Sequence, residues 1–127
     1  MKTKITNVFF AQKAMEEIRA LADLDLPIRE SVKVIKLMKE LTKHHQIFDE
    51  ARIKLLQKYG TLNQKESRYD FESDDKRRAF NQEFIDLQDI ELEVEHEMIE
   101  IPEDAKLKPS LLLMFENFVK VKEAPKI

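Results

Sequence analysis

The stretch from Ile28 to Tyr59 constrains the fold most, because its pattern predicts a single long amphipathic helix. Apolar side chains recur along it at every third or fourth position, the spacing that collects them on one helical face. That stripe consists of Val34, Met38, Leu41, His45, Phe48, Ala51, Leu55 and Tyr59. A second row is expected to widen the apolar face where the helix begins, and it consists of Ile28, Val32 and Ile35. A helix of this length would extend about 48 Å, so we expect a spine with other elements packed along it.

The residues at both ends of this stretch fit helix boundaries. Pro27 suits the first helical position, where its missing N–H costs nothing. Gly60, the only glycine in the chain, suits a left-handed residue after the last turn. Four positions of the stripe are also spaced by seven, as in a coiled coil; they are Val34, Leu41, Phe48 and Leu55.

Composition excludes several classes of protein. One glycine and four prolines argue against a glycine-rich phosphate loop and against an all-β fold with tight turns. The chain has no cysteine, which excludes disulfides and thiolate chemistry and makes a cytosolic location the simple interpretation. No apolar run approaches the ~20 residues needed to cross a membrane. With 127 residues, we expect one domain over residues 1–127.

Shorter elements are predicted on either side of the long helix. Residues 2–6 alternate as in a strand, and residues 8–22 carry apolar side chains at helical spacing. Residues 61–72 are polar and predict a loop. Ser73 is a suitable N-cap for a helix over residues 74–88.

At Ile90 the apolar period changes from that of a helix to that of a strand. Acidic side chains then alternate with apolar ones, and these acids are Glu91, Glu93, Glu95 and Glu97. We expect a strand over residues 90–101, with a bulge near Met98 and Ile99 where the apolar parity shifts. A single strand cannot satisfy its backbone groups, so it should pair with residues 2–6. The acidic face is either a solvated surface or a contact for a partner.

The C-terminal segment is densely apolar. Pro109 suits a helix start, and residues 109–119 contain an apolar stripe of Leu112, Phe115 and Val119. If that stripe packs inward, Leu113 and Met114 remain exposed and offer a protein contact. The simplest partner is a second copy about a two-fold axis; in the alternative, the apolar ends of the long helix bury the whole segment. Residues 120–127 predict a frayed tail.

Charge is distributed unevenly along the chain. Residues 28–60 hold eight Lys or Arg and four Asp or Glu, whereas residues 61–105 hold five and fifteen, respectively. One interpretation is internal complementarity between a basic spine and an acidic second half; the other is an acidic surface kept for a basic partner. Residues 86–104 hold nine acids and no Lys or Arg, which motivates the hypothesis of a nucleic-acid mimic.

Few residues offer site chemistry. His44 and His45 each have a carboxylate four residues away, Glu40 and Asp49, so each pair could present two ligands on one helix face. Zinc requires three or four ligands, and adjacent helical residues point about 100° apart, so one ion cannot easily use both histidines. We therefore expect no metal, no cofactor and no catalytic residue. The alternative is a metal-dependent enzyme that uses His44, His45 or His96. No signature of a nucleic-acid-binding fold is visible, so direct binding to nucleic acid is not expected.

Several motifs, in the same order along most of the chain, resemble a family of small proteins of tailed bacteriophages and prophages of Gram-positive bacteria, a family of unknown function. The motifs are Lys4–Asn7, Leu26–Pro27, Phe48–Gly60, Phe84–Val94 and Lys108–Leu111. The resemblance implies a virus-encoded protein of the host cytoplasm that binds other proteins. It brings no catalytic residues.

These patterns predict an α+β, predominantly helical domain: a long central helix in an antiparallel helical arrangement, with a minimal two-stranded sheet. The predicted function is that of a non-catalytic phage or prophage accessory protein that binds a host or phage protein, in virion assembly or to inhibit the host protein. The alternative is an acidic mimic of nucleic acid that occupies the basic groove of a host enzyme. The candidate contact residues are Glu91, Glu93, Glu95, Glu97, Leu113 and Met114.

Overall fold

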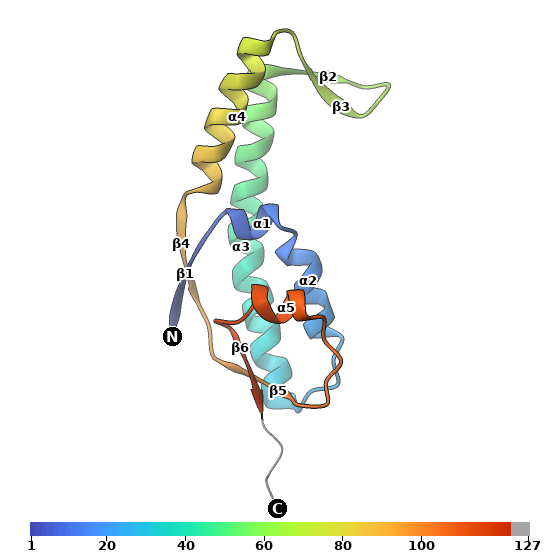
Figure 1. Ribbon diagram of the computed structural model, residues 1–127, viewed down its shortest axis with the longest axis vertical. Helices are drawn as coiled ribbons and strands as arrows, with labels where there is room; N and C mark the ends of the chain where they lie inside the picture. The colour runs from blue at the N-terminus through green and yellow to red at the C-terminus, as the bar shows by residue number, and fades with distance from the viewer. Residues whose placement is uncertain (123–127) are drawn as a thin grey trace, which may run out of the picture.

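The computed structural model describes residues 1–122 and is organised along one helix, α3 (Ile28–Tyr59). A second helix, α4 (Asp74–Gln88), runs back beside the C-terminal half of α3 (Figure 1). On the N-terminal half, α3 packs against α2 (Ala14–Ala22). The prediction of a predominantly helical α+β fold with a long central helix in an antiparallel arrangement is confirmed.

The buried face of α3 follows the predicted stripe. Val34, Leu41 and Phe48 are 1%, 0% and 4% exposed. The expectation for the second row is wrong, because those side chains are on the far side of the helix from this buried face. They are exposed to solvent: Ile28 by 77%, Val32 by 40% and Ile35 by 51%.

The ends of α3 differ from the expectation in detail. The helix ends at Tyr59 and Gly60 is its C-cap, but the backbone of Gly60 is extended, with φ −116° and ψ 170°, so the prediction of a left-handed residue is wrong. Contacts require the glycine instead, since a Cβ atom at this position would lie 2.9 Å from the carbonyl oxygen of Leu56. At the other end, Pro27 is the N-cap rather than the first helical residue.

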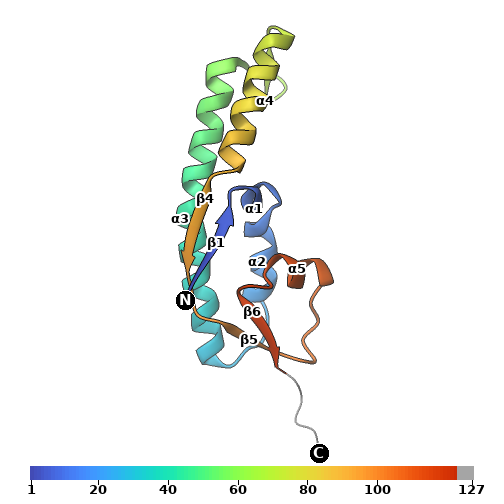
Figure 2. The same cartoon turned by 60° about the vertical axis from the view of Figure 1, so that its left-hand side comes forward.

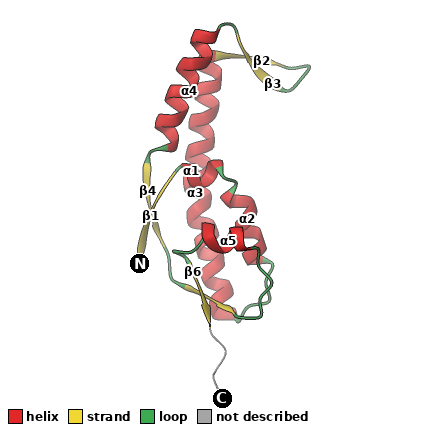
Figure 3. Ribbon diagram, viewed as in Figure 1, coloured by secondary structure: helices red, strands yellow, loops and turns green. Residues whose placement is uncertain are grey.

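Small sheets accompany the helices, three of them within residues 1–122 and each with two strands (Figure 3). β1 (Lys2–Thr6) pairs antiparallel with β4 (Glu91–Glu95), as predicted. β2 (Gly60–Asn63) and β3 (Arg68–Phe71) form an antiparallel hairpin. The prediction of a loop over residues 61–72 is therefore wrong.

The strand predicted over residues 90–101 changes partner part-way. Its pairing with β1 ends at Glu95, opposite Lys2. The chain then leaves the sheet instead of forming a bulge, and β5 (Ile99–Pro102) pairs in parallel with β6 (Val119–Lys122). The change of parity that suggested a bulge reflects this exchange of one neighbouring strand for another.

The C-terminal helix is shorter than predicted. α5 covers Pro109–Met114 rather than residues 109–119. Phe118 and Val119 are 1% and 8% exposed, and adjacent residues in a helix would point about 100° apart. Leaving the helix allows both side chains to be buried. Residues 120–122 belong to β6 rather than to a tail, and the rest of the predicted tail, 123–127, lies outside the described residues.

The predicted helix over residues 8–22 is also divided. α1 (Val8–Ala11) and α2 are separated at Lys13, whose φ is 65°. The separate helix α1 carries two adjacent side chains, Phe9 and Phe10, that both enter the core, where they are 9% and 5% exposed. Tertiary packing therefore overrides the local helical pattern here.

The core is concentrated around the N-terminal half of α3. The side chains with less than 2% exposure include Ile18, Leu21, Leu37, Ile99, Ile101, Leu111, Phe115 and Phe118. Residues 48–88, which we call the arm, contain two buried residues, Phe48 and Leu87. We call the rest of the described chain the base. The arm extends beyond the base (Figure 2), and the β2–β3 hairpin lies at its far end (Figure 1).

Candidate functional site

The β2–β3 hairpin projects from the far end of the arm, to one side of the helices (Figure 1). Its register pairs Gly60 with Phe71 and Asn63 with Arg68. Each strand of this sheet has one neighbouring strand, so the hairpin presents both of its outer edges. A projecting element of this kind is accessible to another molecule from several directions.

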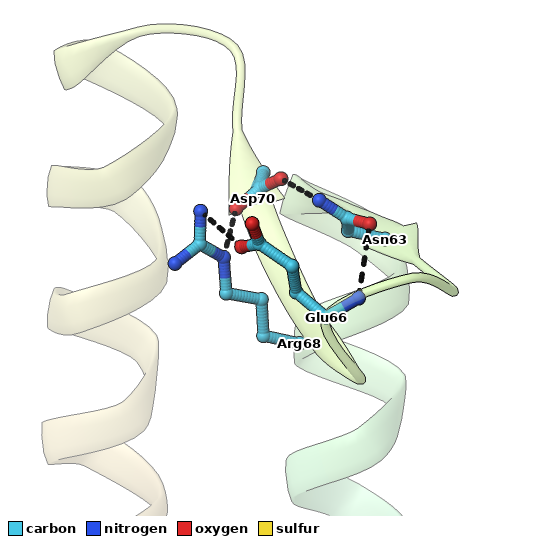
Figure 4. Close-up of polar contacts among 4 residues, drawn as sticks. All are labelled: Asn63, Glu66, Arg68 and Asp70. Atoms are coloured by element: carbon cyan, nitrogen blue, oxygen red, sulfur yellow. Dashed lines mark hydrogen bonds and ion pairs between the residues drawn. The ribbon is translucent and has the colours of Figure 1, made fainter.

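Polar side chains hold the turn of the hairpin (Figure 4). Asn63 Oδ1 accepts a hydrogen bond from the backbone N–H of Glu66 at 3.3 Å, and Asn63 Nδ2 donates to Asp70 Oδ2 at 3.2 Å. Arg68 pairs with Glu66 at 2.7 Å and with Asp70 at 3.0 Å. Exposed ion pairs contribute little stability singly. Here the Asn63–Asp70 hydrogen bond joins the two strands. The contacts of Glu66 with Asn63 and Arg68 hold the turn, in which Ser67 has φ 52°.

An aromatic chain connects the root of the hairpin to the base. Phe71 of β3 contacts Phe80 of α4, with ring centroids 5.2 Å apart. Phe80 stacks on Phe84 at 5.6 Å, and Phe84 contacts Phe48 at 6.2 Å. Phe48 in turn lies 6.2 Å from Phe10 of the base. The position of the hairpin is therefore set by packing that continues down the arm.

The surface of the hairpin combines one apolar residue with polar neighbours. Leu62 is 50% exposed. A shallow depression of about 510 Å³ is lined by Thr61, Leu62, Asn63, Gln64, Lys65 and Asp70. Leu62 and its polar neighbours have, on a small scale, the apolar centre and polar rim of a protein contact.

The predicted acidic face lies where the sequence indicated. Glu91, Glu93 and Glu95 are exposed on β4, and Glu97 is exposed just beyond the strand. The register of the sheet places Lys4 opposite Glu93 and Lys2 opposite Glu95. Two of these four carboxylates therefore face a cation of β1, and opposite charges on directly facing residues attract each other. The β1–β4 sheet therefore carries both acidic and basic side chains rather than a uniformly acidic strip.

The other predicted contact residues lie at the surface of the base. Leu113 is 70% exposed. Met114 is half-buried and packs against the core, so the prediction that it remains exposed is wrong. α5, which carries both, is only six residues long, so the exposed apolar surface here is small.

The histidines occupy three separate environments. His44 Nε2 lies 3.8 Å from Glu40 Oε1, and the ring of His45 lies 5.6 Å from Phe10. His96 is 7% exposed and lies 2.6 Å from the hydroxyl of Thr3. Within residues 1–122, no three His, Cys, Asp or Glu side chains are grouped to hold a metal ion.

Comparison with known proteins gives no match: no protein-family model, no curated protein and no solved structure is similar to this chain. Among the helices of residues 1–122, none is both long enough and apolar enough to span a membrane.

Proposed function

We propose that this protein is non-catalytic and acts by binding another protein through the β2–β3 hairpin. The observation that carries this proposal is the projecting hairpin, whose turn is fixed by Asn63, Glu66, Arg68 and Asp70. An element that is already ordered loses less conformational entropy on binding, so more of its interaction free energy remains as affinity. Leu62 would supply the apolar contact, and the charged side chains around it would supply the polar rim.

The sequence resemblance supports a phage or prophage origin for the protein, and with it a role in the host cytoplasm. The partner is then a host or phage protein, bound during virion assembly or in order to inhibit it. Mimicry of nucleic acid has less support, because Lys2 and Lys4 face Glu95 and Glu93 across the β1–β4 sheet.

Affinity capture tests the proposal with two matched variants. Leu62 on the hairpin and Ile85 on α4 are 50% and 49% exposed, so substitution of either by glutamate leaves the core unchanged. Immobilised wild type, Leu62→Glu and Ile85→Glu are incubated with a lysate of phage-infected Gram-positive cells, and retained proteins are quantified by mass spectrometry. We expect a protein that wild type and Ile85→Glu retain and Leu62→Glu loses.

Two results would contradict the hairpin as the binding element. One is that Leu62→Glu retains the captured protein in the same amount as the wild type does. The other is capture that disappears from wild type when the salt concentration is raised, since screening weakens contacts between charges more than apolar contacts. That second result would favour the acidic mimic.

A further inference from the structure

The first turns of α3 carry an apolar row that the described chain leaves exposed. Ile28, Val32 and Ile35 are 77%, 40% and 51% exposed. Their spacing of four and three residues aligns them along the helix axis. Buried residues such as Val34 and Leu37, each 1% exposed, occupy the other side of the helix. Figure 2 shows α3 along one edge of the molecule, with α2, α5 and β6 to one side of it.

Cations border this row. Arg29, Lys36 and Lys43 follow one another at seven-residue intervals along one flank, and Lys39 continues the row beyond Ile35. All four are exposed. Arg29, Lys36 and Lys39 have no ion-pair partner among residues 1–122, and Lys43 reaches Glu40 at 3.6 Å. We call the combined surface the outer face of α3; it consists of Ile28, Arg29, Val32, Ile35, Lys36, Lys39 and Lys43.

We propose that the outer face of α3 is a docking surface for an acidic amphipathic helix of another protein. Ile28, Val32 and Ile35 occupy the i, i+4 and i+7 positions through which helices are recognised. In coiled-coil terms they are successive d, a and d positions, and Arg29 and Lys36 are the flanking e positions. A partner helix alongside α3 would insert apolar side chains between the three aliphatic residues and place its carboxylates against the cations.

After Ile35, the next residue of α3 that would face a docked helix is Lys39. A charged residue at an a position sets the register of a coiled coil, because it must meet a group of opposite charge. The partner helix therefore needs a carboxylate opposite Lys39. This requirement fixes how far the partner can slide along α3.

The same charges argue against a second copy of α3 as the occupant. In an antiparallel pair, Arg29, Lys36 and Lys43 of one copy would face the same cations of the other, which is unfavourable. In a parallel pair, these cations would face the other flank of the second copy's α3. Ser31 and Met38 occupy that flank, and neither offers a carboxylate. An acidic helix provides complementary charge in either orientation.

This surface is independent of the β2–β3 hairpin. The outer face occupies residues 28–43 in the base, whereas the hairpin begins at Gly60, beyond the other end of α3. The protein could thus contact two partners at once, one at each end of its spine. This docking surface is additional to the proposed function, and either proposal can fail while the other holds.

A designed peptide tests the proposal on the full chain. The probe is a helical peptide of about three heptads, with Ile at a, Leu at d and Glu at e and g, and with one further Glu at the core position that meets Lys39. It is labelled for fluorescence anisotropy. A second peptide has Lys in place of every Glu. We expect the Glu peptide to bind and the Lys peptide not to bind, and we expect added salt to weaken the binding. Ile35→Glu and Lys36→Glu should each weaken binding of the Glu peptide about tenfold or more.

The control variant is Leu62→Glu on the hairpin, which should bind the Glu peptide as the wild type does. Circular dichroism verifies that each variant is folded, and Lys36→Glu, a charge reversal at an exposed position, serves if Ile35→Glu does not fold. Equal affinity for the two peptides, or unchanged affinity in a folded Ile35→Glu or Lys36→Glu, would overturn the proposal. So would binding to phosphatidylglycerol vesicles that requires Ile35 while the Glu peptide does not bind, since the occupant would then be a membrane surface.

Discussion

The hydroxyl of Thr3 and the Nε2 atom of His96 lie 2.6 Å apart, and this hydrogen bond joins β1 to the segment that follows β4. His96 is 7% exposed, and its ring meets that of Phe118 edge-on at a centroid distance of 4.6 Å. The imidazole is therefore buried where the first strand, the fourth strand and the C-terminal segment come together. Burial lowers the pKa of His96 below its ordinary value.

The environment of His96 predicts that acid destabilises the protein. Because the pKa of His96 is lower in the folded than in the unfolded state, the unfolded state binds the proton first as the pH falls. The free energy of unfolding should decrease as the pH falls below about 6.5. The decrease that is due to His96 should level off below the folded-state pKa of this residue. Urea denaturation of wild type and His96→Gln at about pH 7.5 and about pH 5 measures the effect. A difference between the two proteins that is the same at both pH values would contradict it.

Phe48 is predicted to hold the arm on the base. It is 4% exposed and contacts Phe10 on one side and Phe84 on the other. Phe48→Ala should lower the free energy of unfolding by about 3–5 kcal/mol, because it removes a packed aromatic ring and leaves a cavity. The matched control is Ile47→Ala at the neighbouring position, which is 65% exposed and should change stability by about 0.5 kcal/mol or less. Equal losses in the two variants, measured by urea denaturation, would show that Phe48 is not core.

The sequence was informative where a pattern is long or its chemistry is local. The stripe of α3 spans many turns, and the change of period at Ile90 marks the start of β4. Ser73 caps α4 through its own side chain, since its Oγ accepts the N–H of Lys76 at 3.2 Å. Such signals do not depend on distant parts of the chain, so they could be interpreted before the structure was known.

Elements that depend on distant contacts could not be predicted in this way. The first turns of α3 are apolar on two sides, and periodicity alone does not tell which row is buried. Phe118 and Val119 leave the helical conformation because they pack into a core built by other elements. β6 forms by pairing with β5, and no pattern within residues 119–122 predicts a parallel pairing.

The candidate site illustrates the same limit. The exposure of the four glutamates follows from simple alternation, but their lysine neighbours became known only with the register of β1. The hairpin was missed because its turn has no Asn-Gly or Asp-Gly pair, the strongest local signal for a hairpin. The alternation of Arg68, Tyr69, Asp70 and Phe71 was the one signal available in the sequence.

Self-association through α5 remains a prediction. Leu113 is 70% exposed, and an exposed apolar side chain suits an isologous contact with a second copy. Size-exclusion chromatography with light scattering should show a dimer for wild type and a folded monomer for Leu113→Glu. Two monomers of equal thermal stability would contradict the dimer. A monomeric wild type with an unfolded variant would contradict the exposure of Leu113.

Substitution of Gly60 is predicted to destabilise the protein because of contacts rather than backbone conformation. A Cβ atom there would lie 2.9 Å from the carbonyl oxygen of Leu56 and 3.3 Å from that of Asp70, and neither backbone group can move without displacing the helix end or the hairpin. Gly60→Ala should lower the free energy of unfolding by about 1 kcal/mol, the cost of overpacking less the gain from a less flexible unfolded chain.

The comparison with Gly60→Asn separates the two explanations. Asparagine tolerates a left-handed backbone better than alanine does, so at a left-handed position Gly60→Asn would be clearly the milder change. Here φ is −116°, and the Cβ atom of either residue meets the same oxygen atoms. We therefore expect the two variants to lose similar stability in urea denaturation, and both to shift the amide NMR signals of Leu62 and Asp70. An unchanged free energy of unfolding in Gly60→Ala would contradict the close approach of the hairpin to the end of α3.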